Sequence, residues 1–232
     1  MDLEGDLHGA LDADQFALVY QPIFEIRSGR LSGFEALLRW AHPTIGTIPP
    51  DRFIPILEIN GQIVNVGAWV LEEACRTASG WASEPGGEAM PLSMSINVSS
   101  VQLASSTFVR AVQGVLARTG FDPCRLVLEI TETSFMNDPD TVASRLHDLR
   151  ALGVRVAIDD FGTGYSSLSY LHQFPTDILK LDRSFIDTIN AEGPMPPLVK
   201  GLLDLARTLG IETVAEGIEE EHQLAELVHE QF

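Results

Sequence analysis

The stretch SGFEALLRW, residues 32–40, places a glutamate and an arginine inside an otherwise apolar run. Folded as a helix, it would put Glu35 and Arg39 at positions i and i+4, the spacing of an ordinary surface ion pair. Folded as a strand, it would turn Phe34 and Trp40 to one face and Glu35 and Arg39 to the other. Short apolar runs do not separate these two structures by periodicity, so the rest of the chain has to decide.

Five further segments are short and rich in β-branched residues and leucine, which predicts strands. They are PLSMSINVS (91–99), RLVLEITE (125–132), VRVAIDD (154–160), DILKLD (177–182) and ETVAEGI (212–218). Apolar residues at helical spacing predict helices between them, over 105–119, 138–152 and 196–209, each ending at a glycine. This alternation predicts an α/β fold with a parallel sheet, either doubly wound or closed into a barrel.

Polar side chains recur near the carboxyl ends of these predicted strands. They are Glu35, Asn97, Glu129, Asp159, Asp160, Lys180, Asp182 and Glu216. The carboxyl ends of barrel strands converge on one mouth, where active sites are built, and no G-x-G-x-x-G motif supports a dinucleotide-binding fold. The recurrence therefore favours a strand for residues 32–40 and an α/β barrel, for which 232 residues suffice.

Composition and charge exclude several classes of partner. Acidic residues outnumber basic ones 33 to 15, for a formal net charge of −18. Such a surface repels phosphate polymers and anionic lipids, so we expect no nucleic acid polymer and no membrane contact from this segment. The N-terminus lacks a signal peptide pattern, and Cys75 and Cys124, without C-x-x-C spacing, are predicted to be small buried side chains. A cytoplasmic location is the resulting expectation.

The donors at the predicted mouth are all oxygens, which suits Mg²⁺ or Mn²⁺ rather than zinc or copper. Crowded carboxylates repel one another unless cations separate them, so we predict two ions, with Asp159 as the bridging ligand and Asp160 reaching the second ion. Lys180 would orient a water molecule or stabilise a phosphate oxygen. Two alternatives stay open, since Asn97 suits a turn and Asp182 suits a helix cap. The glycine-rich loop over 160–167 is predicted to act as a lid or coupling element.

Six ordered motifs resemble the EAL domain, the bacterial cyclic di-GMP phosphodiesterase. They are EALLRW (35–40), NVSSVQ (97–102), LEITET (128–133), DDFGTGYSSLSYL (159–171), LKLD (179–182) and VAEGIE (214–219). The resemblance implies a modified TIM (β/α)8 barrel whose first strand is antiparallel to the others. It also implies a metal-dependent enzyme that hydrolyses cyclic di-GMP to linear pGpG.

The resemblance assigns a role to each matching position. It implies one ion on Glu35, Asn97, Glu129 and Asp159, a second ion on Asp159 and Asp160, and an attacking water on Lys180. Glu216 would act as general base or complete the metal shell. Gln21, Arg39 and Asp182 would contact the substrate. Glu132 and Glu219 would brace the glycine-rich loop and the lysine.

The resemblance also implies domain limits and partners. The expected limits are an N-terminal flank over 1–15 and an EAL domain over 16–232, truncated before the eighth strand and last helix of the family. A fused GGDEF or sensory domain outside this segment and a homodimer are expected partners. The alternative function is a catalytically weak cyclic di-GMP binding or regulatory module.

Overall fold

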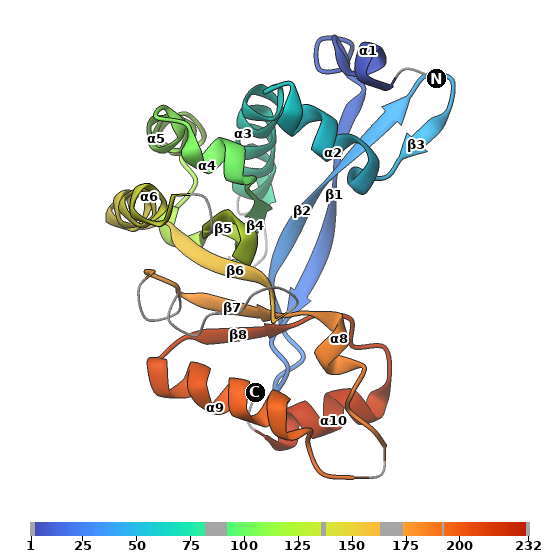
Figure 1. The fold of residues 1–232 in the computed structure, drawn as a ribbon, viewed down its shortest axis with the longest axis vertical. Helices are drawn as coiled ribbons and strands as arrows, with labels where there is room; N and C mark the ends of the chain where they lie inside the picture. The colour runs from blue at the N-terminus through green and yellow to red at the C-terminus, as the bar shows by residue number, and fades with distance from the viewer. Residues whose placement is uncertain (1–2, 82–91, 136–137, 163–173, 192, 231–232) are drawn as a thin grey trace.

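A computed structural model describes residues 3–81, 92–135, 138–162, 174–191 and 193–230, and it is built around a single curled sheet (Figure 1). The sheet has the strand order β1-β2-β4-β5-β6-β7-β8, and β3 pairs with β2. The strands are β1 (Phe16–Phe24), β2 (Leu31–His42), β3 (Gly46–Ile48), β4 (Ser93–Asn97), β5 (Leu126–Thr131), β6 (Arg155–Phe161), β7 (Ile178–Leu181) and β8 (Glu212–Ala215).

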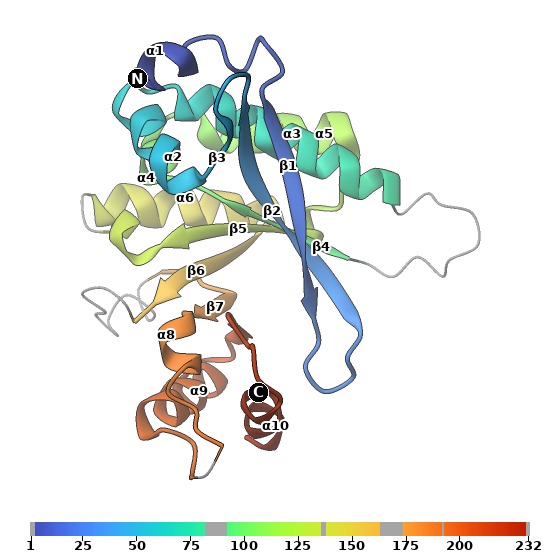
Figure 2. The same ribbon diagram turned by 90° about the vertical axis from the view of Figure 1, so that its right-hand side faces the viewer.

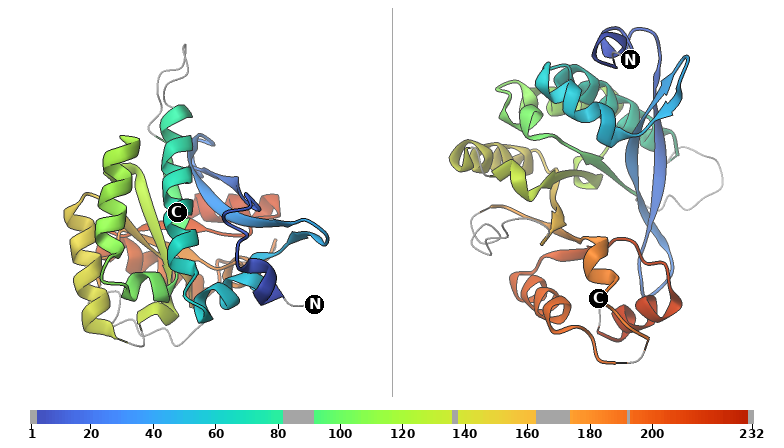
Figure 3. Two further views of the ribbon diagram at one scale, coloured as in Figure 1. Left: turned by 90° about the horizontal axis from the view of Figure 1, so that it is seen from above. Right: turned by 45° about the vertical axis from the view of Figure 1, so that its right-hand side comes forward.

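Helices connect the strands and cover the outer face of the sheet. They are α1 (Leu3–Leu7), α2 (Pro50–Ile59), α3 (Ile63–Trp81), α4 (Ser100–Ala104), α5 (Phe108–Thr119), α6 (Pro139–Ala151), α8 (Arg183–Ile186), α9 (Pro197–Leu209) and α10 (Glu221–His229), with 3-10 turns at Pro123–Arg125 and Glu132–Phe135. Helices α3, α5 and α6 lie side by side on the outer face (Figure 3). The helix predicted over 105–119 begins at Phe108, and a Ser99–Gln102 capping box starts a separate short helix, α4, whose C-cap is Ser105.

The topology confirms the predicted modified barrel with an antiparallel first strand. Strand β1 pairs with β2 in antiparallel register, as does the short strand β3, and the strands β2, β4, β5, β6, β7 and β8 are parallel to one another. The sheet is a curled half-barrel in the described part of the chain: β1 lies at one end and β8 at the other, next to α9 and α10 (Figure 2). The carboxyl ends of the parallel strands therefore point to one mouth.

Strand β2 resolves the ambiguity of residues 32–40 as expected. Glu35 lies opposite Gln21 of β1 and beside Ser95 of β4. On the other face of the strand, Ala36 is 3% exposed and Trp40 is fully buried in the main core. The alternation of side chains thus turns the carboxylate to the inside of the barrel and the apolar residues to the surrounding helices.

The structure also gives the burial of the two cysteines and of the predicted N-terminal flank. Cys75 is buried, but Cys124 is exposed, so the prediction of two buried thiols was wrong for Cys124. Cys124 lies in the 3-10 turn Pro123–Arg125, in which no residue is buried. Within the predicted flank, Leu7 and Ala10 are buried in the main core. No helix in the described ranges is long and apolar enough to span a membrane.

Candidate active site

At the mouth of the half-barrel, four carboxylates surround the ammonium group of a buried lysine. Lys180 of β7 is 2% exposed. Its Nζ lies 2.6 Å from Glu129 Oε2, 2.7 Å from Glu216 Oε1, 3.0 Å from Asp159 Oδ1 and 3.5 Å from Glu35 Oε2. These residues come from β5, the end of β8, β6 and β2, so the structure brings together strand ends that are far apart in the sequence.

Burial and charge shift the proton affinities of this cluster. Burial raises the pKa of Glu129 to about 8; Lys180 acts to lower it, and Glu35 and Asp159 raise it further. Burial also raises the pKa of Glu216. For Lys180, burial acts to lower the pKa, but the surrounding carboxylates outweigh burial and hold it above its ordinary value. One ammonium therefore does not fully compensate the carboxylates around it.

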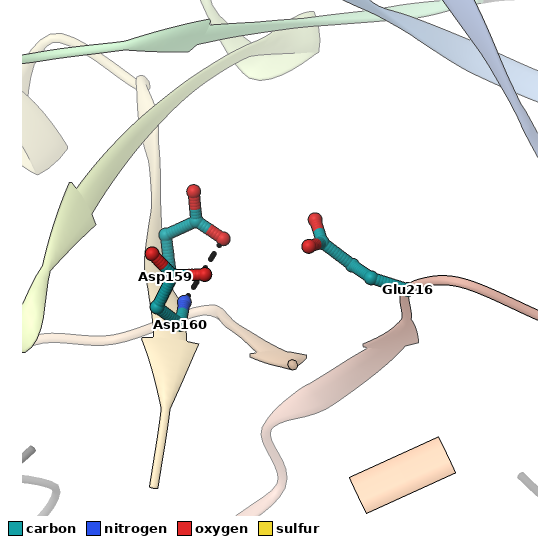
Figure 4. Close-up of side chains that lie close together, drawn as sticks. All are labelled: Asp159, Asp160 and Glu216. Atoms are coloured by element: carbon teal, nitrogen blue, oxygen red, sulfur yellow. Dashed lines mark hydrogen bonds between the residues drawn. The ribbon is translucent and has the colours of Figure 1, made fainter. Parts of the chain in front are cut away.

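A bulge in β6 turns two consecutive aspartates to the same mouth. The register between β6 and β7 shifts between Ile158 and Phe161, and Asp160 has a φ of +51°. The Asp160 N–H donates to Asp159 Oδ1 at 3.0 Å, and Glu216 points toward the pair from the opposite side (Figure 4). In a regular strand these two side chains would lie on opposite faces, so the bulge is what pairs them.

The resulting carboxylate cluster has the composition of a site for hard cations. Oxygens of Asp159, Asp160 and Glu216 lie within 4.8 Å of one another. Burial, followed by the charge of Asp159, raises the pKa of Asp160, so a positive charge nearby would favour its ionised form. With Glu35 and Glu129, and with all five carboxylates ionised, the cluster and the one ammonium would carry a net charge of −4, which two divalent cations would balance. Oxygen donors of this kind suit Mg²⁺ or Mn²⁺.

Three other predicted residues, Asn97, Gln21 and Arg39, come from β4, β1 and β2. Asn97 Nδ2 donates to Glu35 Oε1 at 2.7 Å, so the amide orients the carboxylate. Gln21 is exposed on β1 and, with Glu35, lines a groove of about 1280 Å³ that also reaches Asp159 and Lys180. Arg39 is half-buried, and its Nη1 donates to the Leu38 carbonyl at 2.9 Å.

The other predicted residues lie at the rim. Asp182 Oδ1 accepts from the Ser184 N–H at 2.9 Å and caps α8, the alternative left open by the sequence; this hydrogen bond lowers the pKa of Asp182. Glu132 Oε1 accepts from the Gly162 N–H at 3.4 Å, at the start of the predicted lid. Residues 163–167 of that lid lie outside the described residues. Glu219 pairs with Arg183 rather than with Lys180.

Sequence reasoning missed two residues that contact the segment after β8. Arg183 follows Asp182 in the LKLD motif and pairs with Glu219 at 2.6 Å. Gln223 of α10 accepts from the backbone N–H groups of Glu219 and Glu220. The position of Arg183 beside a motif was an available signal, and so was the spacing of Glu220 and Gln223, which form a capping box at the start of α10.

This chain is similar to known proteins in sequence and in structure. A family model described as "EAL domain" matches residues 4–229. The chain belongs to the EAL domain family. Its EAL sequence is 43% identical over 223 residues to the bifunctional diguanylate cyclase/cyclic di-GMP phosphodiesterase MucR of Pseudomonas aeruginosa, covering 96% of this chain and 32% of MucR. It is 41% identical over 225 residues to the cyclic di-GMP phosphodiesterase NbdA of the same organism, covering 97% of this chain and 28% of NbdA.

Solved EAL structures share this architecture. The structure described as "PaMucR Phosphodiesterase, c-di-GMP complex" matches with a TM-score of 0.89 and 42% identity, covering 99% of this chain and 92% of that one. The FimX EAL domain of Pseudomonas aeruginosa, bound to c-di-GMP, matches with a TM-score of 0.87 at 21% identity, covering 99% and 91%. The second likeness concerns the fold alone. Because the EAL chain spans about a third or less of MucR and NbdA, the properties of those whole proteins do not transfer to it directly.

Proposed function

We propose that this EAL domain hydrolyses one phosphodiester bond of cyclic di-GMP to give linear pGpG, as part of bacterial second-messenger signalling. The observation that carries the proposal is the cluster of Lys180 with four carboxylates at the mouth of the half-barrel. The names of MucR and NbdA, both cyclic di-GMP phosphodiesterases at more than 40% identity, support the choice of substrate.

The proposed cofactors are two Mg²⁺ or Mn²⁺ ions, which the oxygen-only donor set fits. Glu35, Asn97, Glu129 and Asp159 would hold one ion, and Asp159 with Asp160 would hold the other. Such ions lower the pKa of a bound water and neutralise charge on phosphate oxygens. The bulge that directs both aspartates to the mouth supports a bridging role for Asp159.

The remaining residues have proposed roles in the chemistry. Lys180 would hold the attacking water and stabilise the negative charge that develops on the phosphate. Glu216, whose pKa burial raises, would accept the proton from that water or complete the metal shell. The proposed contacts to substrate are Gln21, Arg39 and Asp182, and Glu132 and Glu219 would support the neighbouring loops.

A catalytically weak binding or regulatory module is the alternative function. A receptor needs the walls of the mouth but not the full set of carboxylates. All five carboxylates are present here and face one mouth, which favours the enzyme. The two functions differ in what happens to bound cyclic di-GMP, so they can be separated by experiment.

The decisive experiment changes Asp159 to Asn, which keeps the size of the side chain and removes its charge. Purified chain is incubated with cyclic di-GMP and Mg²⁺ or Mn²⁺, and pGpG is measured by chromatography while binding is measured by calorimetry. We expect turnover to fall by about two to three orders of magnitude, with binding retained in part. Asp204→Asn, on the exposed surface of α9, is the control and should not change the rate. A parent chain that binds cyclic di-GMP without hydrolysing it would establish the receptor.

The proposal extends to the protein around this domain. The bifunctional name of MucR supports a fused GGDEF or sensory domain elsewhere in the protein. A homodimer and a cytoplasmic location belong to the same proposal, and the two free thiols are in keeping with a reducing compartment.

A further inference from the structure

The segment after β8, residues 216–220, begins with Glu216, which faces the aspartate pair, and it makes few backbone hydrogen bonds. At its start, the Glu216 N–H donates to the Leu181 carbonyl of β7 at 3.1 Å. Beyond that point the segment is irregular until α10 begins at Glu221. Glu216 must approach Asp159 and Asp160, two like charges that repel it, although Lys180 attracts it. Besides Lys180 and the packing of Ile218 on the core, two further side chains contact this segment.

Arg183 holds this segment from the side of α8. Its Nη1 lies 2.6 Å from Glu219 Oε1, its Nη2 donates to Glu219 Oε2 at 3.0 Å, and its Nε donates to Asp187 Oδ2 at 3.2 Å. The aliphatic part of Arg183 packs on Gly217, which has a φ of +71°, and a Cβ at Gly217 would lie 2.6 Å from Arg183 Cγ. Two-point contact by a planar guanidinium fixes direction as well as distance.

Gln223 contacts the same segment through the capping box at the start of α10. Its side chain is 5% exposed, its Oε1 accepts from the Glu219 N–H at 2.9 Å and the Glu220 N–H at 3.0 Å, and its Nε2 donates to the Ile186 carbonyl at 3.3 Å. A single buried amide therefore joins α10, the 216–220 segment and the end of α8. Buried amides with all groups bonded give a defined geometry, because each lost bond leaves an unsatisfied group.

We propose that Arg183 and Gln223 are positioning residues that set the distance of Glu216 from Asp159 and Asp160, and thereby the affinity of this carboxylate cluster for a divalent cation. The inference rests on the proposed function, in which that cluster serves metal-dependent hydrolysis. It adds two residues that touch neither the substrate nor the reacting atoms.

Charge and positioning predict opposite effects of removing Arg183 on cation binding. Arg183 carries a positive charge beside an acidic cluster, so removing it would strengthen the binding of a cation if only charge mattered. Loss of positioning weakens cation binding instead, because Glu216 no longer faces the aspartates at a shared distance. Gln223 is neutral, so its removal changes the geometry without changing the charge.

The test measures Mn²⁺ binding directly, by electron paramagnetic resonance on the metal-stripped full chain. Arg183→Met keeps the aliphatic stem against Gly217 and removes the guanidinium, and Gln223→Met removes the amide. We expect the Kd for Mn²⁺ to rise roughly 10- to 100-fold in each variant, the usual effect of losing a partner that orients a ligand. Arg118→Met is the matched control, because Arg118 pairs with Glu72 between α5 and α3 at similar exposure and far from the cluster; its Kd should equal that of the parent.

Activity provides a second readout that a purely structural defect would not share. In both variants, the Mn²⁺ concentration for half-maximal hydrolysis should rise while the rate at saturating Mn²⁺ recovers. An unchanged or lower Kd in Arg183→Met overturns the proposal, and this half-exposed position decides the matter even if Gln223→Met fails to fold in EDTA. A parent chain that binds no Mn²⁺ overturns the proposed function itself, whereas a parent that binds Mn²⁺ beside unaffected variants overturns only this inference.

Discussion

Replacing Lys180 with Met removes the ammonium from the centre of the carboxylate cluster while keeping most of the side-chain volume. The Nζ atom lies 2.6 to 3.5 Å from four carboxylates, and the residue is 2% exposed. At an effective dielectric constant of about 20, each such pair contributes roughly 5 kcal/mol of attraction, offset by the burial of the ammonium. Without the lysine, four carboxylates face one another with no ammonium between them.

The expected consequence is a loss of stability that depends on metal. Removing one partner from a buried ion pair costs about 3 to 5 kcal/mol, because the remaining charge is left uncompensated. Protonation of Glu129, whose pKa is already raised to about 8, limits the loss at neutral pH. We therefore expect a decrease of about 3 kcal/mol in the free energy of unfolding in EDTA. A divalent cation supplies the missing positive charge, so saturating Mn²⁺ should restore much of it.

Urea denaturation, followed by circular dichroism, measures both effects. Parent and variant are compared in EDTA and in saturating Mn²⁺. Lys200→Met is the control, since the Lys200–Glu230 pair is on the surface, and it should unfold like the parent under both conditions. A loss in EDTA below about 1 kcal/mol, the range of exposed pairs, would refute the reasoning. So would a loss of equal size in Mn²⁺, because the deficit would then be one of packing rather than charge.

Separate measurements test the raised pKa of Glu129, the two cysteines, two of the glycines and the choice of metal. In EDTA, the free energy of unfolding should fall between about pH 5 and pH 8, by at most about 1.4 kcal/mol per pH unit, because folded Glu129 keeps a proton that the unfolded chain releases. Glu129→Gln should flatten this slope, and an unchanged slope would contradict the prediction. Iodoacetamide should modify exposed Cys124 in the native protein but reach Cys75, whose pKa burial raises to about 12, only in urea; equal rates in mass spectrometry would contradict this. Gly33→Ala should lower the stability by roughly 1 to 3 kcal/mol, since its Cβ would lie 2.7 Å from a backbone oxygen of β4, whereas Gly80→Ala meets no atom within 4 Å and should not lower the melting temperature. Ca²⁺, with bonds to oxygen of about 2.3 to 2.6 Å against about 2.0 to 2.1 Å for Mg²⁺, should bind without supporting hydrolysis, and equal rates would contradict the proposed metal site.

The sequence alone determined which residues face the inside of the barrel and what chemistry they carry. Alternation in β2 put Glu35 and Ala36 on opposite faces of the strand, and the same period of two placed Asn97 and Glu129 on the faces that point into the barrel. Placing these side chains at one mouth required only the rule that parallel strands end on the same side of the barrel. The antiparallel first strand came from the resemblance to a family, since no local pattern in residues 16–24 sets its direction.

Only the tertiary structure decided how the side chains at the mouth meet. A period of two predicts that Asp159 and Asp160 point to opposite faces, and the bulge at Asp160, with its φ of +51°, reverses this. Likewise, Arg183 pairs with Glu219, 36 residues away, and Gln223 Nε2 donates to the Ile186 carbonyl, 37 residues away. Periodicity is a local property that assigns a face to each residue. Bulges and side-chain partners depend on contacts between distant segments, which form only when the chain has folded.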